Sequence, residues 1–248
     1  MEREANVSGI LSQTVDVIGA AGRAVAIYVV VLGLFNGLGG LVGVTAMDDN
    51  LFSVGANYEL MRSGAGGLLN SLFELAGLVL FVVGSYLLLT RMMDAIGRPL
   101  RAGSRFWSFV GMSILAIIGL MIGFVLLIVP GFILLVRWSA ANGFLLSGNK
   151  GITGALGASW EATGGRGWSI FGAGLVLWIG LAVLSSIVVG IVAATGFTAS
   201  GGFSPLFGVA MTVSGLFEAF NNAASFAFSI AVFHLVAPGD TSVADVFE

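Results

Sequence analysis

The chain has 248 residues, of which 57% are hydrophobic and 9% are charged, with a formal net charge of −3 at pH 7. Because roughly a quarter of the residues of ordinary globular proteins are charged, this composition excludes a soluble domain and indicates an integral membrane protein. The chain has no cysteine, which excludes disulfides and cysteine metal sites, and its single histidine, His234, excludes a multi-histidine metal site.

Helices are the expected elements, because an apolar segment of about 20 residues crosses the hydrocarbon and must satisfy its own backbone polar groups. Residues 7–22 come first and carry apolar residues on one face, which predicts an amphipathic helix lying in the membrane interface. The predicted spans follow at about 24–46, 67–90, 107–129, 131–147, 168–195 and 206–236, with a second interfacial helix at 151–164. The predicted fold class is therefore an all-α integral membrane protein with six transmembrane helices and interfacial amphipathic helices.

The fourth span is unusual, because its sequence, IVPGFILLVRW, is short and contains an arginine. Pro130-Gly131 reads as the turn that opens this span, and Arg137 follows the glycine by six residues. An unpaired charge at the bilayer centre costs about 2.5–3.5 kcal/mol, so Arg137 needs a partner or water. Two alternatives stay open. Arg137 either snorkels toward the cytoplasmic headgroups or pairs inside the membrane with Glu74 or Glu218.

Lysine and arginine are distributed unevenly between the two sides that these spans define. With Arg137 set aside, eight lie on one side and Arg62 lies alone on the other. The eight are Arg3, Arg23, Arg91, Arg98, Arg101, Arg105, Lys150 and Arg166. Because short cytoplasmic loops are rich in these residues, we expect both termini to be cytoplasmic. The polar, acid-containing start MEREANVSG also predicts no cleavable signal peptide.

Internal similarities suggest a repeat. VSGILSQTVDVIG aligns with ITGALGASWEATG, and both place apolar or small residues along one helical face that includes Val15 and Trp160. SLFELAG in the second span aligns with GLFEAFN in the sixth, and the ends of the second, fourth and sixth spans align Arg91, Arg137 and His234. The simplest architecture is three units, each an interfacial helix followed by a pair of spans. Chance similarity between low-complexity apolar segments is the alternative.

One part of the chain has the arrangement of a known bacterial family. The run IVPGFILLVRWSAANGFLLSGNKGITGALGASWEATGGRGWSIFG combines Pro-Gly, Arg-Trp, a Gly-x-x-x-Ala-Leu helix and a Gly-Arg-x-Trp start to the next span. It resembles the membrane domain attached to some bacterial glycerophosphodiester phosphodiesterases and YciC-type inner-membrane proteins. The resemblance is specific over about residues 130–172 and looser over 7–33. It implies a helical protein of the bacterial inner membrane linked to lipids or the envelope, and it implies no activity, since the family's enzyme is a separate soluble barrel.

Carboxylates inside spans are the sharpest candidates for a functional site, because intramembrane charges are costly and usually face a partner or a wet cavity. Asn70 precedes Glu74 by four residues, on the same helical face, and two asparagines follow Glu218 by three and four residues. The predicted polar site comprises Glu74, Asn70, Glu218, Asn221, Asn222 and Arg137. These residues either bridge the second and sixth spans by hydrogen bonds or line a pocket for a headgroup or a proton-coupled substrate.

Glycines occur at four-residue spacing inside the spans, as at Gly33 and Gly37. Small residues at this spacing let helices approach closely, so tight packing within the chain is expected, with a dimer face or a lipid groove as alternatives.

No catalytic motif accompanies these residues, since the chain lacks a Gly-x-Ser-x-Gly elbow, a P-loop, a His-Glu-x-x-His sequence and a dinucleotide fingerprint. We therefore expect no enzyme activity, no cofactor, no metal site and no nucleic-acid partner. The first hypothesis is a non-catalytic inner-membrane protein that binds or organises lipids or envelope partners, alone or as an accessory subunit of a membrane complex. The alternative is a small transporter or lipid flippase that uses the Glu/Asn clusters. Membrane lipids are the expected partners, and a protein partner or a second copy stays open.

Overall fold

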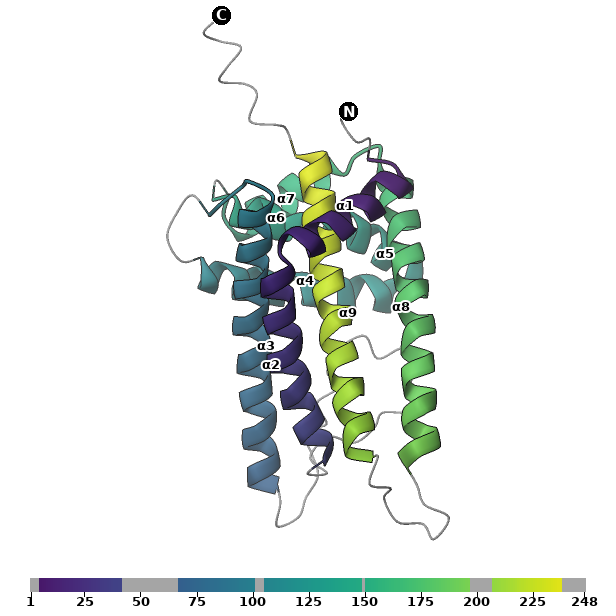
Figure 1. Ribbon diagram of the computed structural model, residues 1–248. Coiled ribbons are helices and arrows are strands. Elements are labelled where there is room, and N and C mark those ends of the chain that lie inside the picture. Colours follow the sequence, from purple (N-terminus) through teal and green to yellow (C-terminus); the bar gives the residue numbers. More distant parts are fainter. Residues whose placement is uncertain (1–4, 42–66, 101–104, 149, 197–206, 238–248) are drawn as a thin grey trace, which may run out of the picture. The chain divides into compact units, whose positions relative to one another are not determined.

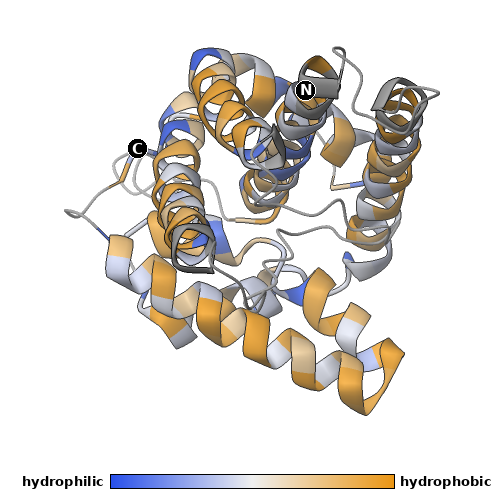
Figure 2. Cartoon of the chain, turned by 90° about the horizontal axis from the view of Figure 1, so that it is seen from below, coloured by the Kyte–Doolittle hydropathy of each residue, from blue (hydrophilic) through white to orange (hydrophobic). Residues whose placement is uncertain are grey.

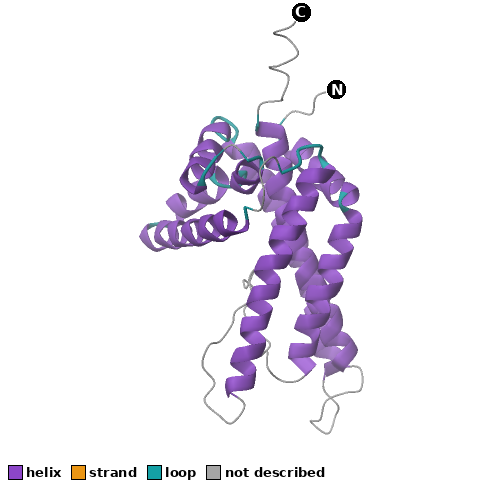
Figure 3. Ribbon diagram, turned by 90° about the vertical axis from the view of Figure 1, so that its left-hand side faces the viewer, coloured by secondary structure: helices purple, strands orange, loops and turns teal. Residues whose placement is uncertain are grey.

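The computed structural model describes residues 5–41, 67–100, 105–148, 150–196 and 207–237. These residues form nine α-helices and no strand (Figure 3). Six stretches of these described residues are long and apolar enough to cross a membrane. Apolar residues make up most of the long helices (Figure 2), as in membrane spans. The all-α membrane fold predicted from composition and hydropathy is thus confirmed.

The helices follow the chain in the order labelled in Figure 1. They are α1 (Val7–Ala20), α2 (Gly22–Leu41), α3 (Gly67–Ala95), α4 (Phe106–Leu126), α5 (Ile128–Arg137), α6 (Ala141–Leu146), α7 (Ile152–Ala162), α8 (Gly167–Gly196) and α9 (Phe207–Val236). The predicted end of the first span at 42–46, the loop that follows it with Arg62, and Arg3 and Arg101 lie outside the described residues.

The chain forms two compact units. Unit 1 comprises Met1–Ala21, Leu89–Val176 and Ser225–Glu248, and unit 2 comprises Gly22–Leu88 and Leu177–Ala224. The boundaries fall inside α3, α8 and α9, so these three long helices contribute residues to both units.

The core of unit 1 forms around α6, a helix of 6 residues of which all but Asn142 are buried. Gly143 lies so close to the ring of Phe233 on α9 that a Cβ atom would collide with it. Phe144 meets the same ring edge-on, with 4.9 Å between the ring centroids. The absence of a side chain at Gly143 therefore allows the short helix to pack directly on the end of α9.

The two segments predicted as interfacial helices are helical, as α1 and α7, and their burial differs in part from the predicted apolar face. Thr14 and Ser159, which align in the two segments, are both buried. Val15 and Trp160 were placed on the same face, but they are exposed. With 3.6 residues per turn, Val15 is turned well away from the line of buried residues on α1, Ile10, Thr14 and Val17. The buried face is thus narrower than the sequence pattern suggested.

The turn between the third and fourth predicted spans is at Leu127, not at Pro130-Gly131 as expected. The backbone of Leu127 is extended, with φ −162° and ψ 144°, and α5 begins at the next residue. Pro130 therefore lies in the first turn of α5. A proline is tolerated there because the first N–H groups of a helix have no intrahelical acceptor.

The predicted span 131–147 is also not one helix, because α5 ends at Arg137 and α6 begins at Ala141. The break leaves backbone groups without helical partners, and two of them are bound by the hydroxyl of Ser159 on α7. Its Oγ accepts a hydrogen bond from the backbone N–H of Ala140 at 3.2 Å and donates to the carbonyl of Arg137 at 2.7 Å. Backbone groups freed by the interruption thus gain a partner from a neighbouring helix.

In unit 2, α2 contacts both α9 and α3. A Cβ atom at Gly33 would lie 2.5 Å from the Cα of Leu216, and one at Gly37 would lie 2.9 Å from the Cα of Thr212. The glycine spacing thus brings the backbones of α2 and α9 together, as expected. On the α3 side, Phe35 stacks on Phe73 with 4.2 Å between the ring centroids.

Candidate functional site

Glu218, one of the predicted intramembrane carboxylates, has a defined partner in unit 2. It is partly buried on α9, and its Oε2 accepts a hydrogen bond from the Nδ2 of Asn36 at 3.3 Å. Asn36 lies on α2 beside Gly37, so this bond lies at the close contact of the two helices. The bond joins the sixth span to the first, whereas the sequence suggested a bridge from the sixth span to the second.

Asn36 was not recognised as a site residue from the sequence. The signal was present in GLFNGLGG, where an asparagine follows Gly33 by three residues and directly precedes Gly37. A polar side chain on a face where two helices approach closely is well placed to bond across the interface. The partner of an intramembrane carboxylate can therefore be sought among polar residues next to such glycines.

The remaining predicted site residues occupy α3 and α9. Glu74 is partly buried on α3, directly after Phe73, which stacks on α2. Asn70 lies in the first turn of α3, and its side chain is outside the described part of the structure. Asn221 and Asn222 are partly buried on α9, in the turn after Glu218. The structure therefore groups Glu218 and its two asparagines along one helix segment with Asn36 opposite.

Arg137 ends α5 and is bound to α7 within unit 1. Its Nη1 donates a hydrogen bond to the carbonyl of Trp160 at 3.2 Å, and the guanidinium lies 5.3 Å from the centroid of the Trp160 ring. Because the last carbonyls of a helix lack intrahelical donors, the arginine satisfies one of them and places its charge at the negative end of α7. Within unit 1, Arg137 therefore binds the C-terminal end of α7. Glu74 and Glu218 belong to unit 2.

Arg105 has a similar role, which the sequence did not reveal. Its guanidinium donates hydrogen bonds to the carbonyls of Leu145 at 3.1 Å, Gly148 at 2.6 Å and Lys150 at 2.6 Å. These acceptors lie at and just beyond the C-terminal end of α6, where a cation is favoured. From sequence, Arg105 counted only toward the charge bias, because its acceptors are backbone atoms some 40 positions further along the chain. Both arginines that flank the α4–α5 pair thus join elements of unit 1.

His234 does not form a catalytic arrangement in the described part of unit 1. Its Nδ1 is buried and makes no hydrogen bond. The charged group that acts on it is Arg98, a cation whose guanidinium lies 5.1 Å from the centroid of the Phe233 ring. A histidine base needs a group that orients its ring and a nucleophile within reach. The described residues also contain no cluster of three or more His, Asp or Glu that could hold a metal ion.

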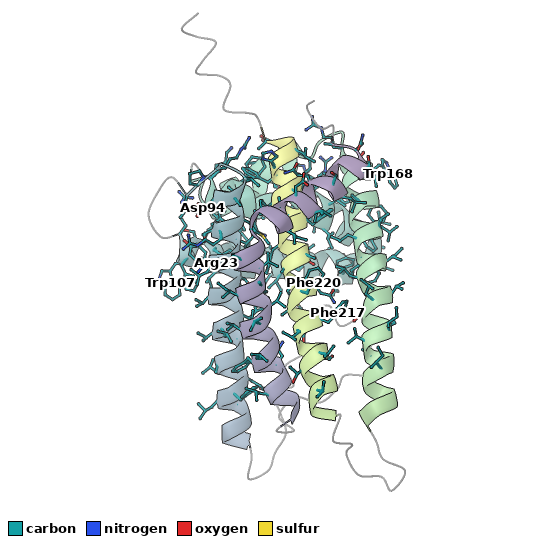
Figure 4. The ribbon with its side chains drawn as sticks, viewed as in Figure 1. Arg23, Asp94, Trp107, Trp168, Phe217 and Phe220 are labelled. Atoms are coloured by element: carbon teal, nitrogen blue, oxygen red, sulfur yellow. The ribbon has the colours of Figure 1, made fainter. Side chains whose placement is uncertain are left out.

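Two tryptophans point outward from unit 1 at the starts of helices (Figure 4). Trp107 of α4 is 80% exposed and Trp168 of α8 is 87% exposed. Both occur in the pattern Gly-x-Arg-x-Trp-Ser, as GSRFWS and GGRGWS, with the arginine two residues before the tryptophan. Tryptophan is enriched at the level of the lipid headgroups in membrane proteins.

Several polar side chains therefore join helices, namely Asn36 and Glu218 in unit 2 and Arg137 and Ser159 in unit 1. The exposed large hydrophobic residues include two tryptophans at helix starts and many aliphatic side chains. Comparisons of the chain with models of known families, with curated proteins and with solved structures found no match.

Proposed function

We propose that this chain is a non-catalytic protein of the bacterial inner membrane that binds and organises lipids, with both termini in the cytoplasm. The observation that carries the proposal is the pair of exposed tryptophans, Trp107 and Trp168, each two residues after an arginine at the start of an apolar helix. Indole rings favour the headgroup level, and arginines near a membrane surface attract anionic headgroups. The exposed aliphatic residues that follow on both helices suit acyl chains.

The use of polar groups inside the helices supports a non-catalytic role. The carboxylate of Glu218 is engaged by Asn36 where the backbones of α2 and α9 touch. Arg105 and Arg137 are engaged by backbone carbonyls. These contacts stabilise helix packing. The resemblance of residues 130–172 to YciC-type membrane proteins supports the same link to lipids.

Native mass spectrometry of the protein released from nanodiscs of phosphatidylglycerol and phosphatidylethanolamine tests this proposal. We expect the wild-type protein to retain phosphatidylglycerol in preference, and the double variant Trp107→Ala/Trp168→Ala to retain several-fold fewer lipids. The matched control is Trp178→Ala, which removes an indole from the middle of α8, far from any arginine in sequence. Equal retention by the wild-type protein and the double variant would refute the proposal.

The same proposal includes a role as an accessory subunit of a membrane complex, and a separate observation on α8 supports that role. On α8 no residue from Gly174 to Ile191 is buried, so this apolar stretch is open to lipid or to another membrane protein. Protein extracted directly from its native membrane would then give a mass spectrum with an additional protein component. A spectrum of the single chain with lipids only would exclude this form of the proposal.

The second candidate is a lipid flippase, favoured by the placement of Glu218 and Asn36 inside apolar helices. Reconstituted vesicles with fluorescent phospholipids distinguish the two candidates. The lipid-organising proposal predicts that the protein does not accelerate the transfer of lipids between leaflets. A flippase would accelerate it, and Glu218→Gln, which keeps an acceptor for Asn36 but removes the charge, would reduce the rate.

A further inference from the structure

The α4–α5 hairpin is a long apolar element with a tight turn. No charged residue occurs between Arg105 and Arg137. The aliphatic residues of the turn, Val125–Val129, are each at least 67% exposed. The two helices are in close contact beside the turn, because a Cβ atom at Gly131 would lie 2.5 Å from the ring of Phe124. The hairpin is therefore a packed unit that presents an apolar tip.

A series of aromatic contacts shows which part of α8 lies beside the tip of the hairpin. Phe124, near the end of α4, meets Phe132 of α5 with 5.4 Å between the ring centroids. Phe132 meets Phe171 of α8 at 5.7 Å, and Phe171 meets Trp168 at 6.2 Å. All four residues belong to unit 1. Phe171 lies about 7.5 Å along α8 from Arg166, so the tip is level with the first turns of that helix.

A hairpin that crossed the bilayer beside α8 would meet that helix much further along. The hydrocarbon is about 30 Å thick, which corresponds to about 20 residues of an α-helix. The aromatic contact with α8 occurs instead five residues after Arg166. In addition, α5 has 10 residues and rises only about 15 Å, half of the thickness to be crossed.

The rest of α4 also stays beside other elements of unit 1. A Cβ atom at Gly111 would lie 2.8 Å from the side chain of Ile152 on α7, and one at Gly119 would lie 2.5 Å from the ring of Trp138. The first half of α4 therefore packs on α7 and the second half on α5. Within this unit, α4 runs across the direction of the α9 segment Ser225–Val236 (Figures 1 and 3).

We infer that the α4–α5 hairpin does not cross the bilayer but lies within one leaflet, on the side of Arg105 and Arg166, where acyl chains cover its exposed surface. The distribution of charge fits this position. The arginine at each end of the hairpin, Arg105 or Arg137, donates a hydrogen bond to a backbone carbonyl of another element of unit 1. The tip has only aliphatic residues. A turn at the opposite headgroups would present polar residues to water. An element of this size in one leaflet displaces lipid from that leaflet alone.

The inference goes beyond the proposed lipid-binding role and does not depend on it. If the hairpin stays in one leaflet, four helices cross the membrane, namely α2, α3, α8 and α9. Both ends of the hairpin then lie on the same side of the membrane, as they also would if the hairpin crossed it twice.

Spin labels placed along α4 test the inference, because the chain has no cysteine of its own. Single cysteines at the exposed positions Leu115, Ile118, Ile122 and Leu126 carry the label in reconstituted vesicles. Collision with oxygen and with a water-soluble nickel complex measures the depth of each label. A matched series on α8, at Ile179, Val183 and Ile187, reports on a helix expected to cross.

We expect the α4 labels to lie on one side of the midplane and to differ in depth by less than about one helical turn, 5.4 Å. The α8 series should change depth by about 1.5 Å per residue. An α4 series with the same gradient through the midplane would overturn the inference. So would labelling of Leu127→Cys by a membrane-impermeant maleimide, from either side. If Leu127→Cys reacts from the side opposite to that from which Lys150→Cys reacts, the hairpin crosses the bilayer. If both variants react from the same side, the hairpin lies outside the bilayer. Retention of lipids in the nanodisc experiment does not change any of these outcomes.

Discussion

Thr14 and Ser159 occupy equivalent positions in the two aligned segments, and both hydroxyls are buried. They differ in what they bind. Thr14 donates to the carbonyl of Ile10 in its own helix at 2.8 Å. Ser159 joins α7 to the turn between α5 and α6, through the N–H of Ala140 and the carbonyl of Arg137. Equivalent sequence positions therefore predict equivalent burial but not equivalent partners.

Replacing Ser159 with alanine should lower the free energy of unfolding by about 1–3 kcal/mol, because it removes the hydrogen-bond partner of the buried N–H of Ala140. Thr14→Val should cost less than about 1 kcal/mol, since its acceptor carbonyl keeps its bond within α1. Chemical denaturation of both variants in one detergent, followed by circular dichroism, measures the difference. If Thr14→Val is as harmful as Ser159→Ala, the bridge to the α5–α6 turn does not stabilise the protein.

At the level of the elements, α2 and α9 touch through backbone atoms. Gly215 on α9 faces the carbonyl of Gly33, 2.5 Å from where its Cβ would be. Rotation of a side chain cannot relieve such a contact, so an added methyl group must separate the helices or bend them. The hydrogen bond between Asn36 and Glu218 would be lengthened by the same movement.

Gly33→Ala is therefore expected to destabilise the protein by about 1–3 kcal/mol through overpacking. Gly180→Ala on α8 is the matched control, because nothing lies within 4 Å of its added Cβ. This control should be neutral or stabilising by up to about 1 kcal/mol, since alanine favours a helix more than glycine does. Thermal unfolding of both variants in the same detergent compares them. A tolerated Gly33→Ala would contradict the close contact of α2 and α9.

The break between α5 and α6 shows why element boundaries were harder to predict than the elements themselves. The run GFILLVRWSAANGFLL has no proline after Pro130 and is apolar enough to continue as one helix. The serines that bind backbone groups at the interruption, Ser159 beside Ala140 and Ser229 beside Ser139, come from helices later in the chain. Local sequence preference was overridden by a tertiary hydrogen bond.

At the scale of the whole molecule, the charge bias predicts the orientation in the membrane. A cysteine introduced in place of Gly55, in a loop outside the described residues, should react with a membrane-impermeant maleimide only from outside the cell. A cysteine in place of Lys150 should react only from the cytoplasmic side, because the loops rich in lysine and arginine stay inside. The Cys-free chain makes both experiments single-site measurements. Reaction from the reverse side at either position would contradict the predicted topology, whether or not the α4–α5 hairpin crosses the bilayer.

The sequence by itself determined that this is an all-α membrane protein, because the apolar fraction and the length of its apolar runs admit no other fold. It also identified Glu218 as exceptional, since a carboxylate in an apolar run is detectable without neighbours. The partner of Glu218 was decided by tertiary structure, because Asn36 lies 182 positions earlier and only the glycine contact brings it within reach.

The same division applies to the hairpin. Length and apolarity mark α4 as a membrane span, and nothing in its own residues specifies whether it runs through the bilayer or along it. The contact of Gly111 on α4 with Ile152, and that of Phe132 on α5 with Phe171, supply this information, because they place the hairpin beside the start of α8, close to Arg166. Apolar sequence determines that a segment enters the hydrocarbon, and packing against neighbouring helices determines how deep it goes.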